Sequence, residues 1–192
     1  MGREFELKYA ATADAQASIR STFGPWQEIR METTYFDTPD GALSARHITL
    51  RLRKENDVTV CTLKTPLPDG SRGEWECRTT DIGDGIRALI AIGAPKILAG
   101  LTINGVFPSC GARFTRLSAQ IPTADGMAEL ALDYGILLGG GREIPLCEVE
   151  IELKSGSDEA AVTLAHKLAA QYDLKEEPKS KFRRAMALLQ GE

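Results

Sequence analysis

The stretch Glu4-Phe5-Glu6-Leu7-Lys8 decides how this chain folds, because charged and apolar residues alternate in it without a break. A period of two is typical of a β-strand, in which successive side chains point to opposite faces of a sheet. One face of this strand is therefore apolar, and the other carries two carboxylates and an ammonium group. A surface strand in a soluble protein would turn such a charged face to water.

The same alternation recurs along the chain, and the sign of the charge is sorted strand by strand. Arg51 and Arg53 form a basic face, whereas Glu148, Glu150 and Glu152 form an acidic one. Carboxylates bind hard divalent cations, and arginine and lysine bind phosphate oxygens. The pattern therefore predicts a closed sheet whose charged interior holds a metal–polyphosphate complex. The alternative is an interior network of ion pairs that closes the barrel without a ligand, which is costly for so many buried charges.

The predicted elements alternate between charged strands and amphipathic helices. Strands are expected at 3–10, 29–37, 47–54, 57–65, 73–80, 106–121, 127–135 and 143–154, and helices at 12–23, 84–100, 158–172 and 180–190. We find no repeat and no interdomain linker. The sequence therefore predicts one α+β domain over residues 1–192, with a closed antiparallel eight-stranded barrel and flanking helices.

Composition excludes several classes of function. The chain has 192 residues, 43% hydrophobic residues and a net charge of −4, so no global basic field is available for nucleic-acid binding. No apolar run is long enough for a membrane span, and no signal segment opens the sequence, which predicts a cytoplasmic protein without a membrane partner. The four cysteines are scattered and do not suggest a metal site. Tyr35 and Asp37 are expected to order a loop or a strand end.

An ordered set of motifs resembles the CYTH domain of the triphosphate tunnel metalloenzymes. The motifs are Glu4–Lys8, Tyr35–Thr38, Leu50–Arg53, Thr62–Lys64, Arg72–Glu76, Arg113–Arg116, Asp133, Glu148–Glu152 and Ser180–Lys181. The resemblance is closest to the bacterial inorganic triphosphatases, many of which carry a second, histidine-rich CHAD domain that we do not expect here.

The resemblance implies a β-barrel tunnel that hydrolyses inorganic triphosphate to pyrophosphate and phosphate with Mg²⁺ or Mn²⁺. Lys8 and Glu6 are the implied catalytic residues, with Lys8 either acting on the water or binding phosphate. The implied triphosphate-binding residues are Lys8, Arg51, Arg53, Lys64, Arg113, Arg116 and Lys181. The implied metal ligands are Glu4, Glu6, Asp133, Glu148, Glu150 and Glu152, and Glu74 and Glu76 are further tunnel residues. Strand parity leaves open which of Arg113 and Arg116 faces inward.

Other functions are compatible with the same residues. On the same fold, the chain could be a thiamine or nucleoside triphosphatase or an adenylyl cyclase, although no aromatic cluster for a base is evident. A different class is a polyphosphate- or nucleotide-binding module without turnover, but such a module has no need for so many carboxylates. The expected partner is a small triphosphate, and a homodimer is left open.

Overall fold

One antiparallel sheet forms the body of the protein. The structure is a computed structural model, and it describes residues 2–3, 5–67 and 72–191. Within these residues the sheet has ten strands in the order β1-β6-β5-β4-β3-β7-β8-β9-β2-β10. The strands are β1 (Gly2–Arg3), β2 (Glu6–Ala10), β3 (Gln27–Asp37), β4 (Thr49–Glu55), β5 (Val58–Pro66), β6 (Arg72–Arg78), β7 (Phe107–Pro122), β8 (Met127–Gly139), β9 (Arg142–Ser155) and β10 (Lys175–Glu176).

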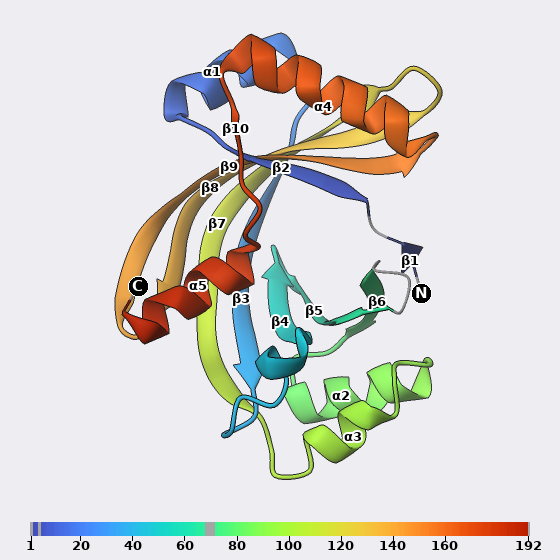
Figure 1. Cartoon of the computed structure of the whole chain (residues 1–192), viewed down its shortest axis with the longest axis vertical. Helices are drawn as coiled ribbons and strands as arrows, with labels where there is room; N and C mark the ends of the chain where they lie inside the picture. The colour runs from blue at the N-terminus through green and yellow to red at the C-terminus, as the bar shows by residue number, and fades with distance from the viewer. Residues whose placement is uncertain (1, 4, 68–71, 192) are drawn as a thin grey trace.

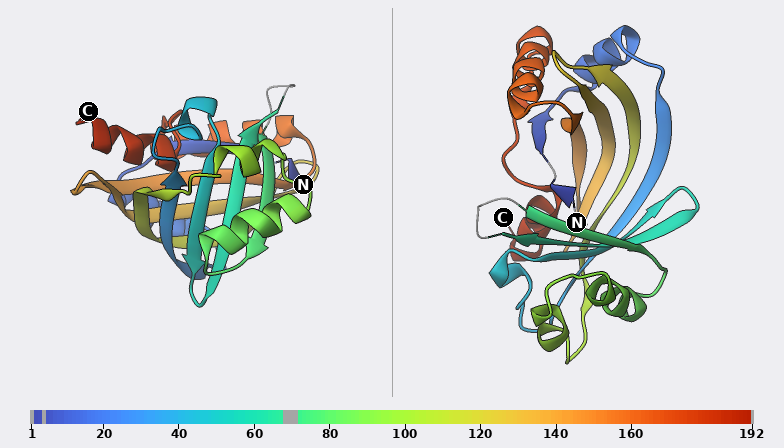
Figure 2. Two further views of the ribbon diagram at one scale, coloured as in Figure 1. Left: turned by 90° about the horizontal axis from the view of Figure 1, so that it is seen from below. Right: turned by 90° about the vertical axis from the view of Figure 1, so that its right-hand side faces the viewer.

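The sheet is strongly curved, and helices cover its outer side in two places (Figures 1 and 2). Helices α1 (Ala13–Thr22) and α4 (Asp158–Tyr172) pack on apolar residues of β2, β8 and β9, including Tyr9, Leu130 and Ile151. Helices α2 (Ile82–Ala91) and α3 (Ile97–Leu101) pack on the apolar side of β4, β5 and β6. The outward apolar side chains of each strand are thus buried under helices, as their alternation predicts.

The side-chain caps of the helices explain where they begin. Thr12, Asp81, Ser157 and Ser180 each accept a hydrogen bond from a backbone amide in the first turn of the helix that follows.

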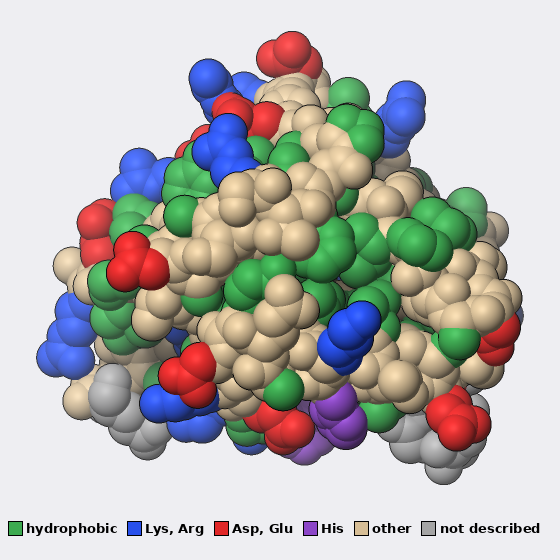
Figure 3. Space-filling view, turned by 90° about the horizontal axis from the view of Figure 1, so that it is seen from above, with side chains coloured by type: hydrophobic (Ala, Val, Ile, Leu, Met, Phe, Trp, Pro, Cys, Tyr) green, Lys and Arg blue, Asp and Glu red, His purple; other side chains and the backbone are tan. Residues whose placement is uncertain are grey.

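The surface above α1 and α4 mixes both charge signs with hydrophobic side chains (Figure 3). In the described ranges, no helix combines the length and apolar character needed to cross a bilayer.

Helix α5 (Lys181–Gln190) lies on the concave side of the sheet (Figure 1). Its residues Phe182, Ala185 and Leu188 join an apolar cluster with strand residues that include Phe114 and Leu137. The helix therefore covers one part of the concave face. The rest of that face carries the charged side chains.

Closure of the sheet into an eight-stranded barrel is not confirmed. The sheet ends in β1 and β10, and the described residues contain no pairing between these two ends. Part of the reason is that β2 is paired on both edges, with β9 along its length and with β10 at Tyr9 and Ala10. Strand β1, which precedes β2 in the chain, nevertheless pairs with β6 in the other half of the sheet.

The longer elements agree with the sequence predictions within about four residues, with one clear difference, whereas the short strand β10 and the 3-10 helix at Ser44–Arg46 were not predicted. The single helix expected at 84–100 is two helices, α2 and α3, separated by a turn that contains Gly93 and Pro95. Gly93 has a φ of 98°, which favours glycine and ends α2.

Candidate active site

A charged cavity of about 540 Å³ lies on the concave side of the sheet. Strands β2, β3, β4, β5, β6, β7 and β9 and the start of α5 contribute its walls. It is lined by most of the residues singled out in the sequence, namely Glu6, Lys8, Arg51, Arg53, Lys64, Glu74, Glu76, Arg116, Glu150, Glu152 and Lys181. The structure therefore brings together charged residues from both ends of the chain. Glu4 lies outside the described residues.

The wall formed by β4 and β5 is basic. Arg53 donates a hydrogen bond from Nε to the Thr33 hydroxyl at 3.2 Å and lies 3.8 Å from Glu55. Burial, together with the like charge of Arg51, lowers the pKa of Arg53 to about 10, so this guanidinium is still charged at neutral pH. Lys64 lies 3.3 Å from the Glu74 carboxylate.

Arg51 offers a donor that the described part of the chain does not use. Its Nε is buried and has no hydrogen-bond partner there, and its nearest acidic contact is Glu74 at 4.0 Å. A buried donor without an acceptor is costly. An anion in the cavity would satisfy it.

The opposite wall is acidic and is set by strand register. Glu6 on β2 pairs with Glu152 on β9, which in turn pairs with Glu129 on β8. Lys154 partly balances this row, at 2.8 Å from Glu152 and 3.8 Å from Glu129. Glu129 was not among the predicted site residues, although its alternation with the apolar residues of its strand is the same as that of Asp133.

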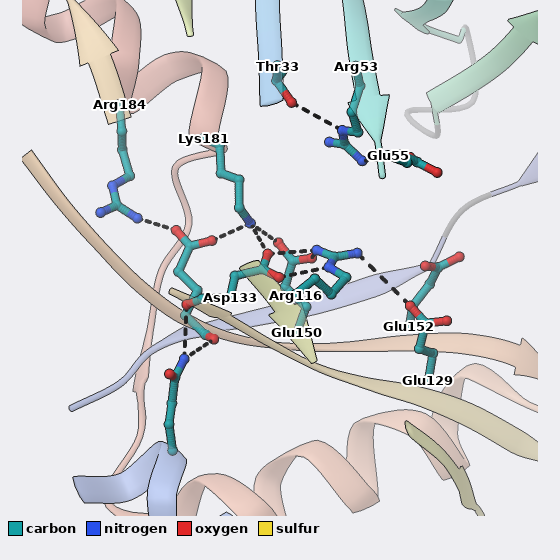
Figure 4. Close-up of polar contacts among 12 residues, drawn as sticks. Thr33, Arg53, Glu55, Arg116, Glu129, Asp133, Glu150, Glu152, Lys181 and Arg184 are labelled. Carbon is teal, nitrogen blue, oxygen red and sulfur yellow. Dashed lines mark hydrogen bonds and ion pairs between the residues drawn. The ribbon is translucent and has the colours of Figure 1, made fainter. Parts of the chain in front are cut away.

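Lys181 joins three buried carboxylates at the start of α5 (Figure 4). Its ammonium group lies 2.8 Å from Asp133, 2.6 Å from Glu148 and 2.5 Å from Glu150. Asp133 and Glu148 are fully buried. The carboxylate oxygens of this triad lie within 4.8 Å of one another, a spacing that a metal ion could span. In this structure the lysine ammonium lies among them.

Two arginines complete the charge balance of the triad. Arg116 binds both oxygens of Asp133 at 2.7 Å and also contacts Glu150, while Arg184 contacts Glu148. Three cations therefore face three carboxylates. Both oxygens of all three carboxylates are engaged by these contacts, and of the three only Glu150 lines the cavity. The implied role as metal ligands therefore has most support for Glu6 and Glu152, less for Glu150, and least for Asp133 and Glu148.

The pKa shifts of the triad follow from burial opposed by charge. Burial alone would raise the pKa of Glu150, but the attraction of Lys181 and Arg116 outweighs it and lowers this pKa below its usual range. For Glu148 burial prevails, and its pKa is raised despite Lys181. Burial would lower the pKa of Lys181, yet the three carboxylates raise it. Lys181 is therefore charged throughout the physiological range.

The position of Arg113 does not match the role in triphosphate binding that the resemblance implies. This residue does not line the cavity but lies on the outer side of β7, where it is exposed and pairs with Glu143 at 3.3 Å. Residues three apart on a strand point to opposite faces. The inward arginine of this strand is therefore Arg116.

Asp37 has the structural role expected of it. Its carboxylate is buried and accepts hydrogen bonds from the backbone amides of Thr38, Leu43 and Ser44. It therefore orders the loop that follows β3, which confirms the prediction. Tyr35 faces the cavity and packs against Phe182, with ring centroids 5.1 Å apart.

Comparison with known proteins agrees with this architecture. The chain is 27% identical to the inorganic triphosphatase of Haemophilus influenzae over 98% of its own length and 55% of that protein. It thus spans about half the length of this curated relative. Among solved structures, it is similar to a proposed adenylate cyclase from Bacillus halodurans, with a TM-score of 0.64 and 22% identity over 94% of this chain and 96% of that one.

A second solved structure shares the fold to the same degree. It is a proposed adenylyl cyclase from Hippeastrum, described as having a dominant triphosphatase activity, with a TM-score of 0.64 and 19% identity over 98% of this chain and 95% of that one. The CYTH domain matches residues 2–186, which is nearly the whole sequence. The chain therefore belongs to the CYTH domain family.

Proposed function

We propose that this protein hydrolyses inorganic triphosphate with the help of a divalent cation. One observation carries the proposal: a single cavity gathers the cations of β4 and β5 and the carboxylates of β2 and β9, with further charges of both signs between them. Such a lining matches a polyphosphate, whose oxygens need cations, and a bound metal ion, which needs oxygen ligands. The 27% identity to an inorganic triphosphatase supports the same substrate.

The donor set fits Mg²⁺ or Mn²⁺. Glu6, Glu150 and Glu152 line the cavity and would hold the ion through carboxylate oxygens, which are the ligands that hard cations prefer. When bound, such an ion neutralises phosphate charge and lowers the pKa of a water ligand. Glu129 lies beside Glu152 in the sheet and would orient the acidic row.

The basic wall would bind and orient the substrate. Arg51 and Arg53 offer guanidinium groups that can contact two phosphate oxygens at once, and Lys64 adds a point charge. These contacts would hold the phosphate chain in line with the attacking water. Such positioning, together with charge neutralisation, is the main contribution of a protein to phosphoryl transfer.

Lys8 is assigned to phosphate binding. It lines the cavity, and the carboxylate opposite it in the sheet, Glu150, already contacts Lys181 and Arg116. The positive charge of Lys8 is therefore available to a ligand. A role as a base would require a neutral amine.

A substrate panel tests the proposal. With Mg²⁺ or Mn²⁺ present, we expect kcat/KM for inorganic triphosphate to exceed that for ATP and thiamine triphosphate by at least about tenfold, or roughly 1.4 kcal/mol. The reason is that the cavity-lining side chains are mostly charged and contact phosphate rather than an organic group. Products are measured as phosphate, pyrophosphate and cyclic AMP. Equal turnover of ATP, or cyclic AMP as a product, would favour the nucleotide enzymes, and binding without turnover would favour a non-catalytic module.

The two faces of the sheet provide a matched pair of arginine variants. Arg53→Gln should lower kcat/KM for triphosphate by about 10- to 100-fold, because a hydrogen bond to a charged group is worth about 1.5–3 kcal/mol. Arg113→Gln removes the same charge from the outer face and should change kcat/KM by less than about twofold. Steady-state kinetics on both variants checks this. A larger loss in Arg113→Gln than in Arg53→Gln would reverse the assignment of the walls.

A further inference from the structure

A second groove continues from the active-site cavity along α5. It has a volume of about 810 Å³ and lies between the loop after β3 and the side of α5 that carries Arg183 and Met186. Four residues line both spaces, namely Thr49, Arg72, Ser180 and Phe182. The groove and the cavity are therefore neighbouring parts of one concave surface.

The groove is basic. Arg72, Lys179 and Arg183 supply positive charge, and among the described residues Asp40 is the single acidic residue of its lining. The Asp40 carboxylate is engaged by the Thr38 hydroxyl at 2.7 Å on its own loop. Within the described ranges, neither Lys179 nor Arg183 forms an ion pair. This composition favours an anionic ligand.

The groove is poorly suited to a nucleoside. Among the described residues that line it, the aromatic side chains are the exposed imidazole of His47 and the larger ring of Phe182, which is buried against Tyr35 with ring centroids 5.1 Å apart. Little of the ring is therefore free to stack on a base. Further phosphate groups match the exposed cations better.

We propose that this groove binds the phosphates beyond the third in a linear inorganic polyphosphate whose reacting end lies in the cavity. The proposal rests on the proposed function, because it takes the cavity as the site of the first three phosphates. Arg72 lines both spaces and would contact the chain where it leaves the cavity. In the reaction, water adds to the terminal phosphorus, the bridging P–O bond breaks, and phosphate leaves. The bridging oxygen stays on the shortened chain, and the water's proton passes to the products or solvent.

The test compares inorganic tetraphosphate with triphosphate on the full chain. Lys179→Gln/Arg183→Gln removes two exposed cations that line the groove and not the cavity. The ratio of kcat/KM for tetraphosphate to that for triphosphate should fall by about tenfold, equivalent to roughly 1.4 kcal/mol. Arg20→Gln/Lys167→Gln removes the same two charges from the exposed surfaces of α1 and α4 and should leave the ratio unchanged.

A binding measurement separates this proposal from the proposed function. Calorimetry on metal-free protein should give tighter binding of tetraphosphate than of triphosphate, with the difference lost in the groove variant. Equal affinities for both chains in the unmodified protein, or an equal loss for both chains in the variant, would overturn the groove assignment. Absence of triphosphate hydrolysis with an intact affinity difference would instead overturn only the proposed function. A variant that impairs ATP use but not tetraphosphate use would assign the groove to a nucleoside.

Discussion

Replacing Lys181 by methionine is expected to destabilise the protein by about 3–5 kcal/mol at neutral pH, because removal of one partner leaves buried charges uncompensated. The ammonium group lies within 2.8 Å of each of three buried carboxylates. Without it, Arg116 and Arg184 would still contact these carboxylates, but two cations would face three anions and one buried negative charge would be uncompensated. For a chain of this size, such a loss lowers the melting midpoint by about 10 °C. Urea unfolding and thermal melts measure both effects.

The pH dependence of the destabilisation shows whether lost charge balance is its cause. Lys181 has a raised pKa in the folded state, so its contribution is present at neutral pH and is lost only far above it. The pKa of Glu150 is lowered in the folded state, so its ionised carboxylate stabilises the fold at pH values above the ordinary pKa of about 4.3. This stabilisation is lost as the pH falls through and below that value. The destabilisation of Lys181→Met should therefore shrink as the pH approaches this range and the carboxylates take up protons.

Matched variants keep this prediction specific. Lys167→Met removes an exposed lysine from α4 and should cost less than about 0.5 kcal/mol. Adding Glu148→Gln to Lys181→Met should restore part of the lost stability, since it removes one buried negative charge. A cost below about 1 kcal/mol for Lys181→Met, with no dependence on pH, would mean that the triad is not a charge-balanced unit.

Glu6→Gln should reduce triphosphate turnover by at least about a hundredfold at limiting Mg²⁺ and should weaken metal binding. Glu6 lies opposite Glu152 on the acidic wall, and an amide in its place removes one negative charge without changing the size of the side chain. EDTA should abolish the activity of the unmodified protein, and Mg²⁺ or Mn²⁺ should restore it. Calorimetric titration with Mg²⁺ gives a measure that does not depend on activity.

Glu28→Gln is the control for this variant, because Glu28 is exposed on β3 away from the cavity. It should leave both turnover and metal affinity within about twofold of the unmodified protein. If Glu6→Gln binds and uses Mg²⁺ as the unmodified protein does, Glu6 is not a metal ligand.

Much of the sheet was predictable because each long strand has two chemically different faces. The alternation at Leu50–Arg53 and Glu148–Glu152 places apolar residues under helices and charges on the concave side, as observed. Strand β10 was missed because a two-residue strand has no period to detect. Closure of the barrel could not be predicted, since it depends on which strand occupies each edge, and periodicity carries no information on pairing.

The site was predictable in its composition but less so in its contacts. Arg116 rather than Arg113 faces the cavity. Two arginines three positions apart lie on opposite faces of a strand, and their spacing alone does not say which of the two faces inward. The ion pairs of Lys181 with Asp133 and Glu148 depend on how α5 packs inside the sheet. That packing joins distant parts of the chain, so the neutralised triad could not be distinguished in advance from a set of metal ligands.

The pairing of the N-terminal strands has a consequence for how the protein is made. Strand β2 is synthesised before the other long strands, yet its neighbour β9 follows only after nearly all of the sheet has been synthesised. Pairing over so long a separation in sequence must overcome a large loop-closure entropy and is slow. Residues 6–10 therefore join the fold late, and the acidic wall is completed only at that step. A chain released before β9 emerges would contain the basic strands β4 and β5 but not the carboxylates that β9 adds to the cavity.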